Sequence, residues 1–273
     1  MKYQPSLPTH NDNVSQEHPL KDFVVILGWV AAAAVLVFWI MGLAIDAIVD
    51  DLSQETEASL NRMLPVHKMA APAGAGPQQA QLQALVDSLR SCAGLRQPAT
   101  VALSKSDVPN AAVIPGGHIV VFSGLLSQVQ SENGLAFVLA HELAHITQRD
   151  HLRAMGRGIV LFGLAALVTG SDSGLSELLA PVNNLGQASY SRTRESAADA
   201  AALRILHCRY GHAGGATELF AAMKDRDAGV FGLSHYVASH PAMQERIDTL
   251  NRAIQDGKMR VAPVLPLRIA PVT

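Results

Sequence analysis

Hydrophobic residues follow helical spacing over much of this chain, and one uninterrupted apolar run occurs near its beginning. No charged residue occurs between Phe23 and Ile45, and a helix over this range would rise about 34 Å, enough to cross a hydrocarbon core of about 30 Å. A cleaved signal peptide is the alternative, but its apolar core is usually about 7 to 15 residues, and no small-residue cleavage site follows here. We therefore expect a single transmembrane anchor over residues 23–49.

The pattern after the anchor predicts a mainly helical body. Leucine and valine have amphipathic spacing in one segment after residue 80, and three later segments continue the helical pattern. These segments are 81–91, 195–207, 217–224 and 241–254. A further apolar run, Ile159–Thr169, would form only about 16 Å of helix. We interpret it as a core helix, with a shallow membrane-dipping helix as the alternative.

Strand signals are confined to a short region in the middle of the chain. Two apolar runs between Asn110 and Leu126 flank Pro115-Gly116-Gly117, which is typical of a β-hairpin, and Thr100–Leu103 has the composition of a short strand. The expected fold class is therefore α+β, mainly α, with a small sheet edge. Such an edge could hold an extended peptide through main-chain hydrogen bonds.

Changes in composition divide the chain into five expected segments. The stretch Ala70–Gln79 is rich in proline, glycine and alanine and breaks any helix, so the folded domain should begin close to its end. The segments are a disordered tail (1–22), the anchor (23–49), a linker (50–77), the folded domain (78–257) and an extended tail (258–273).

Charge excludes one class of partner and suggests a topology. With 21 basic and 23 acidic residues the formal net charge is -2, and no basic stripe is present, so we expect no nucleic-acid binding. Lys2 and Lys21 precede the apolar run, whereas the first basic residue after it is Arg62. Because basic residues stay on the cytoplasmic side, the body is expected outside the cytoplasm.

Cys92 and Cys208 lie far apart and show none of the paired spacings of a zinc knuckle or a redox motif. Any metal must therefore have other ligands. An oxidising compartment would permit one disulfide, but from the sequence we favour two buried free thiols.

The chemical signal of the chain is the sequence His141-Glu142-Leu143-Ala144-His145. Histidines at i and i+4 project from one helix face and can bind one Zn²⁺, with the glutamate beside the metal as general base. The surrounding run Leu135–Ile146 is otherwise apolar nearly all round, which predicts a buried helix. Buried imidazoles need partners, and a metal is a simpler partner for this pair than separate backbone hydrogen bonds.

A catalytic zinc has three protein ligands, and two residues compete for the third position. His151 has the spacing of the metzincin pattern, but Gln148 stands where that pattern has its chain-bending glycine. Glu195 is followed at i+4 by Asp199, which could hold the outer nitrogen of a ligating histidine. Spacing alone leaves Glu195 and Asp199 equally compatible with a solvated helical face.

Several separated motifs occur in the order found in a known family. They are Asn110-Ala111 with Pro115-Gly116-Gly117, the segment Leu139–His145, Ser191-Arg192 through Glu195 and Ala198-Asp199, and Ser239-His240-Pro241 with Arg246-Ile247. Over most of residues 78–255 the chain strongly resembles the gluzincin family of CAAX prenyl proteases, HtpX and the BepA-type periplasmic peptidases.

The resemblance implies a role for each matching residue. Glu195 would be the third zinc ligand and Asp199 would support a ligand from outside, while His240 and Arg246 would face the substrate and steady the tetrahedral intermediate. The competing interpretation places His240 and Arg246 in an ordinary helix start with a solvated face. At the hairpin, substrate contacts are expected at Asn110, Gly117 and His118.

The sequence therefore predicts a zinc metalloendopeptidase that holds one Zn²⁺ per chain at His141, His145 and Glu195. The one apolar run and the basic residues before it predict a single-pass protein with an exported domain. The resemblance implies a bacterial inner membrane and a periplasmic domain that acts on misfolded envelope polypeptides. Two alternatives stay open: a non-catalytic, zinc-stabilised module that binds unfolded chains, and an HtpX-like protease with a cytosolic active site.

Overall fold

The computed structural model describes residues 19–53, 55–57, 59, 76–114, 116–169, 190–226 and 243–269. The chain divides into two compact units, Met1–Ala44 and Ile45–Thr273. The predicted tail up to residue 18, the linker over 60–75 and His240 lie outside the described residues.

Helix α1 (Pro19–Asp51) contains the predicted apolar run. It begins at a proline, which fits the first turn of a helix because its missing N–H has no partner there. Side chains from Leu20 to Ile40 are exposed, including Phe23 and Trp29. In the part of the chain that the structure describes, α1 alone is long and apolar enough to cross a membrane. The predicted N-terminal apolar helix is therefore confirmed.

The second unit contains a small sheet of mixed direction. Its strands are β1 (Thr100–Ser104), β2 (Ala111–Ile114) and β3 (His118–Phe122), in the order β1-β3-β2. β2 and β3 form the predicted antiparallel hairpin, and Gly116 and Gly117 take left-handed φ angles of 101° and 72° at its turn. The parallel pairing of β1 with β3 was not expected from the sequence.

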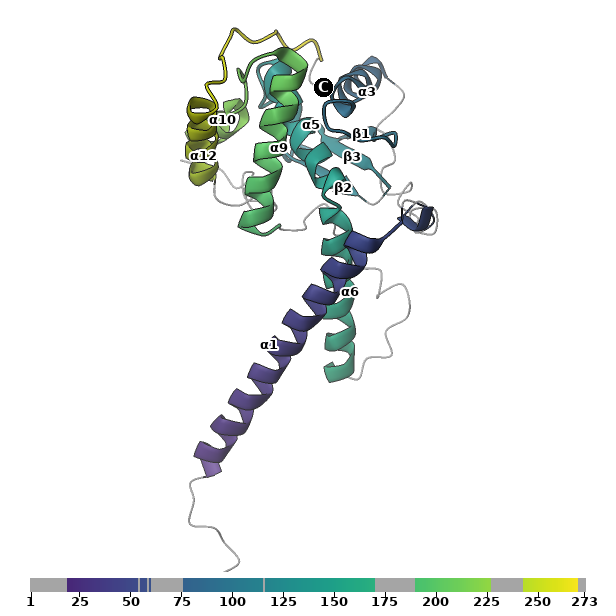
Figure 1. Ribbon diagram of the computed structural model, residues 1–273, viewed down its shortest axis with the longest axis vertical. Helices are drawn as coiled ribbons and strands as arrows, with labels where there is room; N and C mark the ends of the chain where they lie inside the picture. Colours follow the sequence, from purple (N-terminus) through teal and green to yellow (C-terminus); the bar gives the residue numbers. More distant parts are fainter. Residues whose placement is uncertain are drawn as a thin grey trace, which may run out of the picture. The chain divides into compact units, whose positions relative to one another are not determined.

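Helix α5 (Glu132–Thr147) lies at the centre of the second unit (Figure 1). It packs against α3 (Pro77–Arg90) and β2 on one side and against α9 (Arg192–Tyr210) on the other. The short α4 (Ser123–Leu126) follows β3, while α10 (Glu218–Arg226) and α12 (Met243–Asp256) pack together, α10 also on α5 and α12 on α9. The side chain of Ser131 caps the start of α5 by accepting from the N–H of Gly134. All side chains from Asn133 to Ile146 are buried, which confirms the predicted core helix.

Helix α6 (Asp150–Thr169) follows α5 after a turn at Gln148 and Arg149. Leu152 and Met155 in its first half are buried. The described side chains of the predicted core segment are only half-buried or exposed, and Leu161 is 53% exposed. Ile159 packs against the buried cluster of Val49, Leu152 and Met155, so the core interpretation fits Ile159 and is wrong for the exposed Leu161. Membrane dipping stays a prediction.

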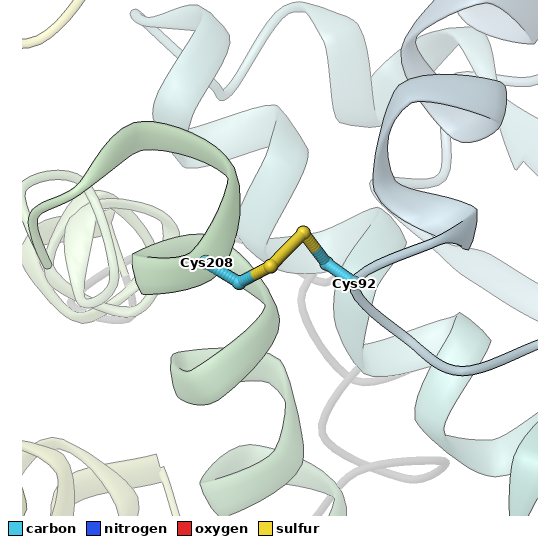
Figure 2. The surroundings of a disulfide bond; sticks show 2 residues. All are labelled: Cys92 and Cys208. Carbon is cyan, nitrogen blue, oxygen red and sulfur yellow. A yellow bond between two sulfur atoms is a disulfide. The ribbon is translucent and has the colours of Figure 1, made fainter.

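The two cysteines form a disulfide, so the interpretation as free thiols is wrong. Cys92 lies just after α3, and Cys208 lies in the last turn of α9 (Figure 2). Both helices pack against α5 and against each other, which brings the two Cα atoms to 5.8 Å, within the reach of a disulfide. The sequence did not predict this proximity, because the two cysteines are separated by 116 residues.

Candidate metal centre

Three predicted ligands meet between α5 and α9. His141 and His145 are one helical turn apart on α5, and their Nε2 atoms lie 3.0 Å from each other. Glu195 comes from the first turn of α9, where Ser191 caps the helix by accepting from the N–H of Arg194. Its two carboxylate oxygens each lie 3.4 Å from the Nε2 atom of one histidine. All three side chains are buried, and one atom from each lies within 4.8 Å of the others, so together they could hold a metal ion.

Each histidine has a carboxylate at its outer nitrogen. The Nδ1 atom of His141 lies 3.0 Å from Asp199, and that of His145 lies 2.9 Å from Asp150. Such partners fix the tautomer and leave both Nε2 atoms directed at the metal position. Asp199 was predicted, but Asp150 was missed. Its signal was its place just beyond the turn that ends the motif helix.

Arg246 joins the carboxylates on the α9 side of the centre. Its guanidinium binds both oxygens of Asp199, at 2.8 and 2.7 Å, and its Nη1 atom lies 3.0 Å from Glu195. Arg246 is buried, so the interpretation as a solvated helical face is wrong. Its position next to a candidate ligand agrees with a role at the site, whereas its contact with substrate stays a prediction.

Glu142 and Tyr190 lie close to the same cluster. Glu142 is fully buried. Burial lowers the pKa of His145, but the hydrogen bonds that Asp150 and Glu195 accept, together with the charge of Glu142, raise this pKa overall. Tyr190 stacks on the ring of His145 with the ring centroids 4.1 Å apart. Burial, followed by the charges of Glu142 and two other carboxylates, raises the pKa of Tyr190 well above its usual value. No sequence motif indicated Tyr190.

The carboxylates of Asp199, Glu195 and Asp150 favour the protonated forms of His141 and His145 when no metal is bound. Burial lowers the pKa of His141, but the hydrogen bonds that Asp199 and Glu195 accept from its ring outweigh this effect and raise the pKa to about 9. Burial would raise the pKa of Asp199, but His141 and Arg246 lower it overall. A divalent cation would satisfy the same negative charge and would compete with these protons.

His151 is not part of the cluster. Its Nε2 atom lies 4.0 Å from the carboxylate of Glu57, and burial lowers the pKa of His151 to about 4. Within the described residues, the grouping able to hold a metal is His141, His145 and Glu195. This geometry agrees with the gluzincin alternative and not with the metzincin one.

Hydrogen bonds of the sheet fix the positions of the three residues that were predicted to contact substrate. The carbonyl of Asn110 accepts from the N–H of Phe122, and the carbonyl of Gly117 accepts from the N–H of Thr100. His118 pairs with Thr100 across the two strands, through the backbone register and through a side-chain hydrogen bond. Gly117 and His118 thus lie beside β1, whereas Asn110 precedes β2 at the other side of the sheet. Their contact with a peptide stays a prediction.

Comparison with known proteins agrees with this geometry. Residues 77–254 match the family described as Peptidase family M48. This chain belongs to peptidase family M48. The match begins at the first residue of α3 and ends in α12, so it includes the predicted ligands and Arg246.

Similar proteins carry several different names. The chain is 28% identical over 192 residues to the putative beta-barrel assembly-enhancing protease of Vibrio cholerae, covering 64% of this chain and 39% of that protein. It is 29% identical over 160 residues to the mitochondrial metalloendopeptidase OMA1 of Schizosaccharomyces pombe, covering 57% and 47%. It is 31% identical over 202 residues to the protease HtpX homolog of Salinibacter ruber, covering 62% and 73%. This M48 chain thus spans less than half the length of the first two.

Proposed function

We propose that this M48 chain is a zinc-dependent endopeptidase. The observation that carries the proposal is the buried cluster of His141, His145 and Glu195, with a base, Glu142, on the same helix. Two imidazoles and one carboxylate are the ligand set of a catalytic zinc that keeps a position open, whereas a structural zinc is closed by four protein ligands. Bound zinc would lower the pKa of a water molecule and polarise the scissile carbonyl.

The protein groups then move and hold the protons. Glu142 takes a proton from the attacking water at its carboxylate and later gives it to the leaving amine nitrogen. Asp199 and Asp150 keep the proton on Nδ1 of each histidine, so that Nε2 stays a ligand. Arg246 holds Asp199 and Glu195 in place, and we assign to it and to His240 the stabilisation of negative charge on the substrate.

The hairpin edge is the proposed place for the substrate backbone. β2 pairs with β3 on one side, and within the described sheet its other side has no strand neighbour. β2 also packs against α5, the helix that carries His141 and His145. An extended peptide could add to this edge through main-chain hydrogen bonds, which gives little sequence selectivity. Asn110, which precedes β2, is the candidate contact at this edge, whereas the contacts proposed for Gly117 and His118 would be made beside β1.

The proposed setting is the outer face of a bacterial inner membrane. Helix α1 would anchor the chain, with Lys2 and Lys21 on the cytoplasmic side. The Cys92–Cys208 disulfide supports an oxidising compartment, because such bonds rarely persist in the cytosol. One relative is named for enhancing beta-barrel assembly, which supports misfolded envelope polypeptides as the substrate class.

The test of the proposed function is Glu142→Gln in the purified full-length protein. We expect zinc content and fold to be unchanged and cleavage of an unfolded test protein to fall by about 100-fold or more, because only the base is removed. Glu55→Gln, at an exposed position, is the matched control and should cleave normally. Equal cleavage by Glu142→Gln would refute the assignment of the base. Binding of the test protein without cleavage by the unaltered chain would instead favour a non-catalytic module.

A further inference from the structure

The last turns of α1 belong to the unit that carries the metal centre. The division between the two units falls before Ile45, inside α1. Val49 is buried in a cluster with Leu152 and Met155 of α6. The two helices approach closely, since a Cβ added at Gly156 would lie 2.9 Å from a methyl carbon of Ile45. The end of α1 is therefore a packed part of this unit.

A chain of ion pairs runs from this end of α1 to a predicted metal ligand. Asp46 is the first charged residue after the apolar run, and its carboxylate lies 3.4 Å from Nη2 of Arg194. The Nη1 atom of the same guanidinium donates to one oxygen of Asp150. The other oxygen of Asp150 lies 2.9 Å from Nδ1 of His145. Asp46 is thus linked through two side chains to the imidazole of His145.

A second set of contacts fixes the turn that carries Asp150. Arg149 has a left-handed φ of 56° at the junction of α5 and α6, an uncommon conformation that needs support from its surroundings. Its guanidinium donates to the carbonyl of Val49 at 2.8 Å and lies 3.2 Å from the carboxylate of Glu57. Arg153 donates to the carbonyl of Gln148 while its Nε atom lies 3.3 Å from Asp46. Both ends of this turn are therefore attached to α1.

Charge balance makes Asp46 the central residue of this arrangement. Arg153, Arg157 and Arg194 all lie within ion-pair distance of its carboxylate, Arg157 at 2.9 Å. Without that carboxylate the guanidinium groups would repel one another and Arg194 would lose one of its two anchors. Asp150 is almost fully buried and needs its cationic partner, so a displaced Arg194 would also weaken its position.

We propose that Asp46, at the end of α1, is a positioning residue for the metal centre and acts through Arg194 and Asp150 on His145. This inference rests on the proposed metal binding by His141, His145 and Glu195. Its consequence is that the catalytic domain, separated from the end of α1, holds its metal more weakly than the full chain does.

The experiment compares Asp46→Asn with Asp50→Asn in the full-length protein in detergent micelles. Asp50 is the matched control, because it loses the same charge on the same helix and pairs with Arg153, but it is not within ion-pair distance of Arg194. Zinc affinity is measured by competition with a chelator, and the Co²⁺ absorption spectrum reports ligand geometry. We expect Asp46→Asn to weaken zinc binding about 3- to 10-fold and to shift the spectrum, less than the 10- to 100-fold expected for Asp150→Asn.

Further variants separate the proposal from a loss of folding. Asp46→Glu keeps the charge and should restore most of the affinity. Arg194→Lys replaces the planar fork, whose two nitrogens reach Asp150 and Asp46, by a single ammonium point charge, so it should resemble Asp46→Asn. It replaces that variant if Asp46→Asn does not fold. Equal zinc affinity of Asp46→Asn and Asp50→Asn would overturn the proposal. A loss of zinc affinity in Arg194→Lys without any loss in Asp46→Asn would overturn it as well. Failure of the unaltered chain to bind zinc would refute the proposed metal site instead.

Discussion

At the scale of single residues, the third ligand is the position that decides the class of the metal centre. Glu195→Ala should strongly reduce zinc occupancy, because it removes one of the three proposed ligands, whose atoms lie within 4.8 Å of one another. His151→Ala should leave occupancy per folded chain unchanged, since this ring lies beside Glu57 and not in the cluster. Zinc measured after dialysis, with folding checked by circular dichroism, distinguishes the two. The reverse order of the two variants would contradict the gluzincin assignment.

The raised pKa of His141 also makes a prediction about pH. A histidine whose pKa is raised by folding stabilises the chain fully below its unfolded pKa of about 6.5, and this stabilisation is lost as the pH rises through about 9. The zinc-free protein should therefore lose stability between these values, by a free energy of unfolding on the order of 3 kcal/mol or less. Apparent zinc affinity should rise over the same range, because zinc needs the neutral imidazole.

Thermal unfolding of the zinc-free protein at pH 5 to 9.5 measures this effect. Asp199→Asn removes the carboxylate whose hydrogen bond with His141 is the largest single cause that raises the pKa of this histidine, so the melting temperature of the variant should change less with pH. A melting temperature of the unaltered protein that stays constant or rises over this range would show that His141 is already neutral in the folded chain.

Two site residues were predicted from the family resemblance, because their spacing alone was equally compatible with a solvated helical face. Glu195 and Asp199 are four residues apart, and the structure places both beside the histidines of α5. Asp150 and Tyr190 reach the centre only through the turn after α5 and the approach of α9. The only sequence signal for Asp150 was its place just after the turn that ends the motif helix, and Tyr190 had none, because tertiary packing brings both side chains to the centre. The same is true of Asp46, which is distant in sequence from every ligand.

At the scale of elements, local patterns were informative and pairings between distant segments were not. The hairpin around Pro115 was predicted because a turn signal separates two apolar runs that are close in sequence. The parallel pairing of β1 with β3 needs a crossover, which no local pattern specifies. The cysteines show the same limit, since α3 and α9 are neighbours in the folded structure, where both pack against α5, although they are far apart in sequence.

The disulfide joins two of these distant elements and should matter for stability more than for chemistry. The bond joins two residues with a sequence separation of 116 and therefore closes a long loop. We expect the double variant Cys92→Ser with Cys208→Ser to lose about 2 to 5 kcal/mol of unfolding free energy, because the unfolded chain is then no longer constrained. Glu195 lies at the opposite end of α9 from Cys208, about 20 Å along the helix. Zinc affinity of the folded variant should therefore stay close to that of the unaltered chain.

Urea unfolding curves measure the change in stability, and chelator competition measures the metal affinity. Unaltered protein treated with a reducing agent is the matched comparison, because it loses the same bond without losing a sulfur atom. An unchanged midpoint in both samples would mean that the bond contributes nothing to stability. A large loss of zinc affinity with the fold intact would mean that the disulfide positions α9 at the centre.

At the scale of the whole molecule, the helix α1 connects the apolar segment to the unit with the metal centre. The sequence predicted an anchor and a separate folded domain, joined by a linker. In the structure α1 continues to Asp51, and its last turns already pack against α6. Apolar composition could locate the run that is long enough to cross a membrane. It could not show that Val49 and Asp46, at its end, have partners a hundred residues later in the chain.

The orientation of the chain relative to the membrane is predicted from the positions of its basic residues and from the disulfide. If Lys2 and Lys21 keep the start of α1 in the cytoplasm, everything after α1 is exported. Protease added to spheroplasts should then digest the metal-binding unit while a cytoplasmic marker protein stays intact. The cysteines should resist alkylation until they are reduced, because the exported unit carries the Cys92–Cys208 bond.

Two further results would show whether the charges cause this orientation. Changing both lysines to glutamine should increase the fraction of chains that are protected in intact spheroplasts, since fewer basic residues then hold the N-terminal side inside. Protection of the unaltered chain until lysis, together with thiols that react at once, would place the metal centre in the cytosol. In that compartment the disulfide would be reduced, and the substrates would be cytosolic or membrane proteins instead of envelope proteins.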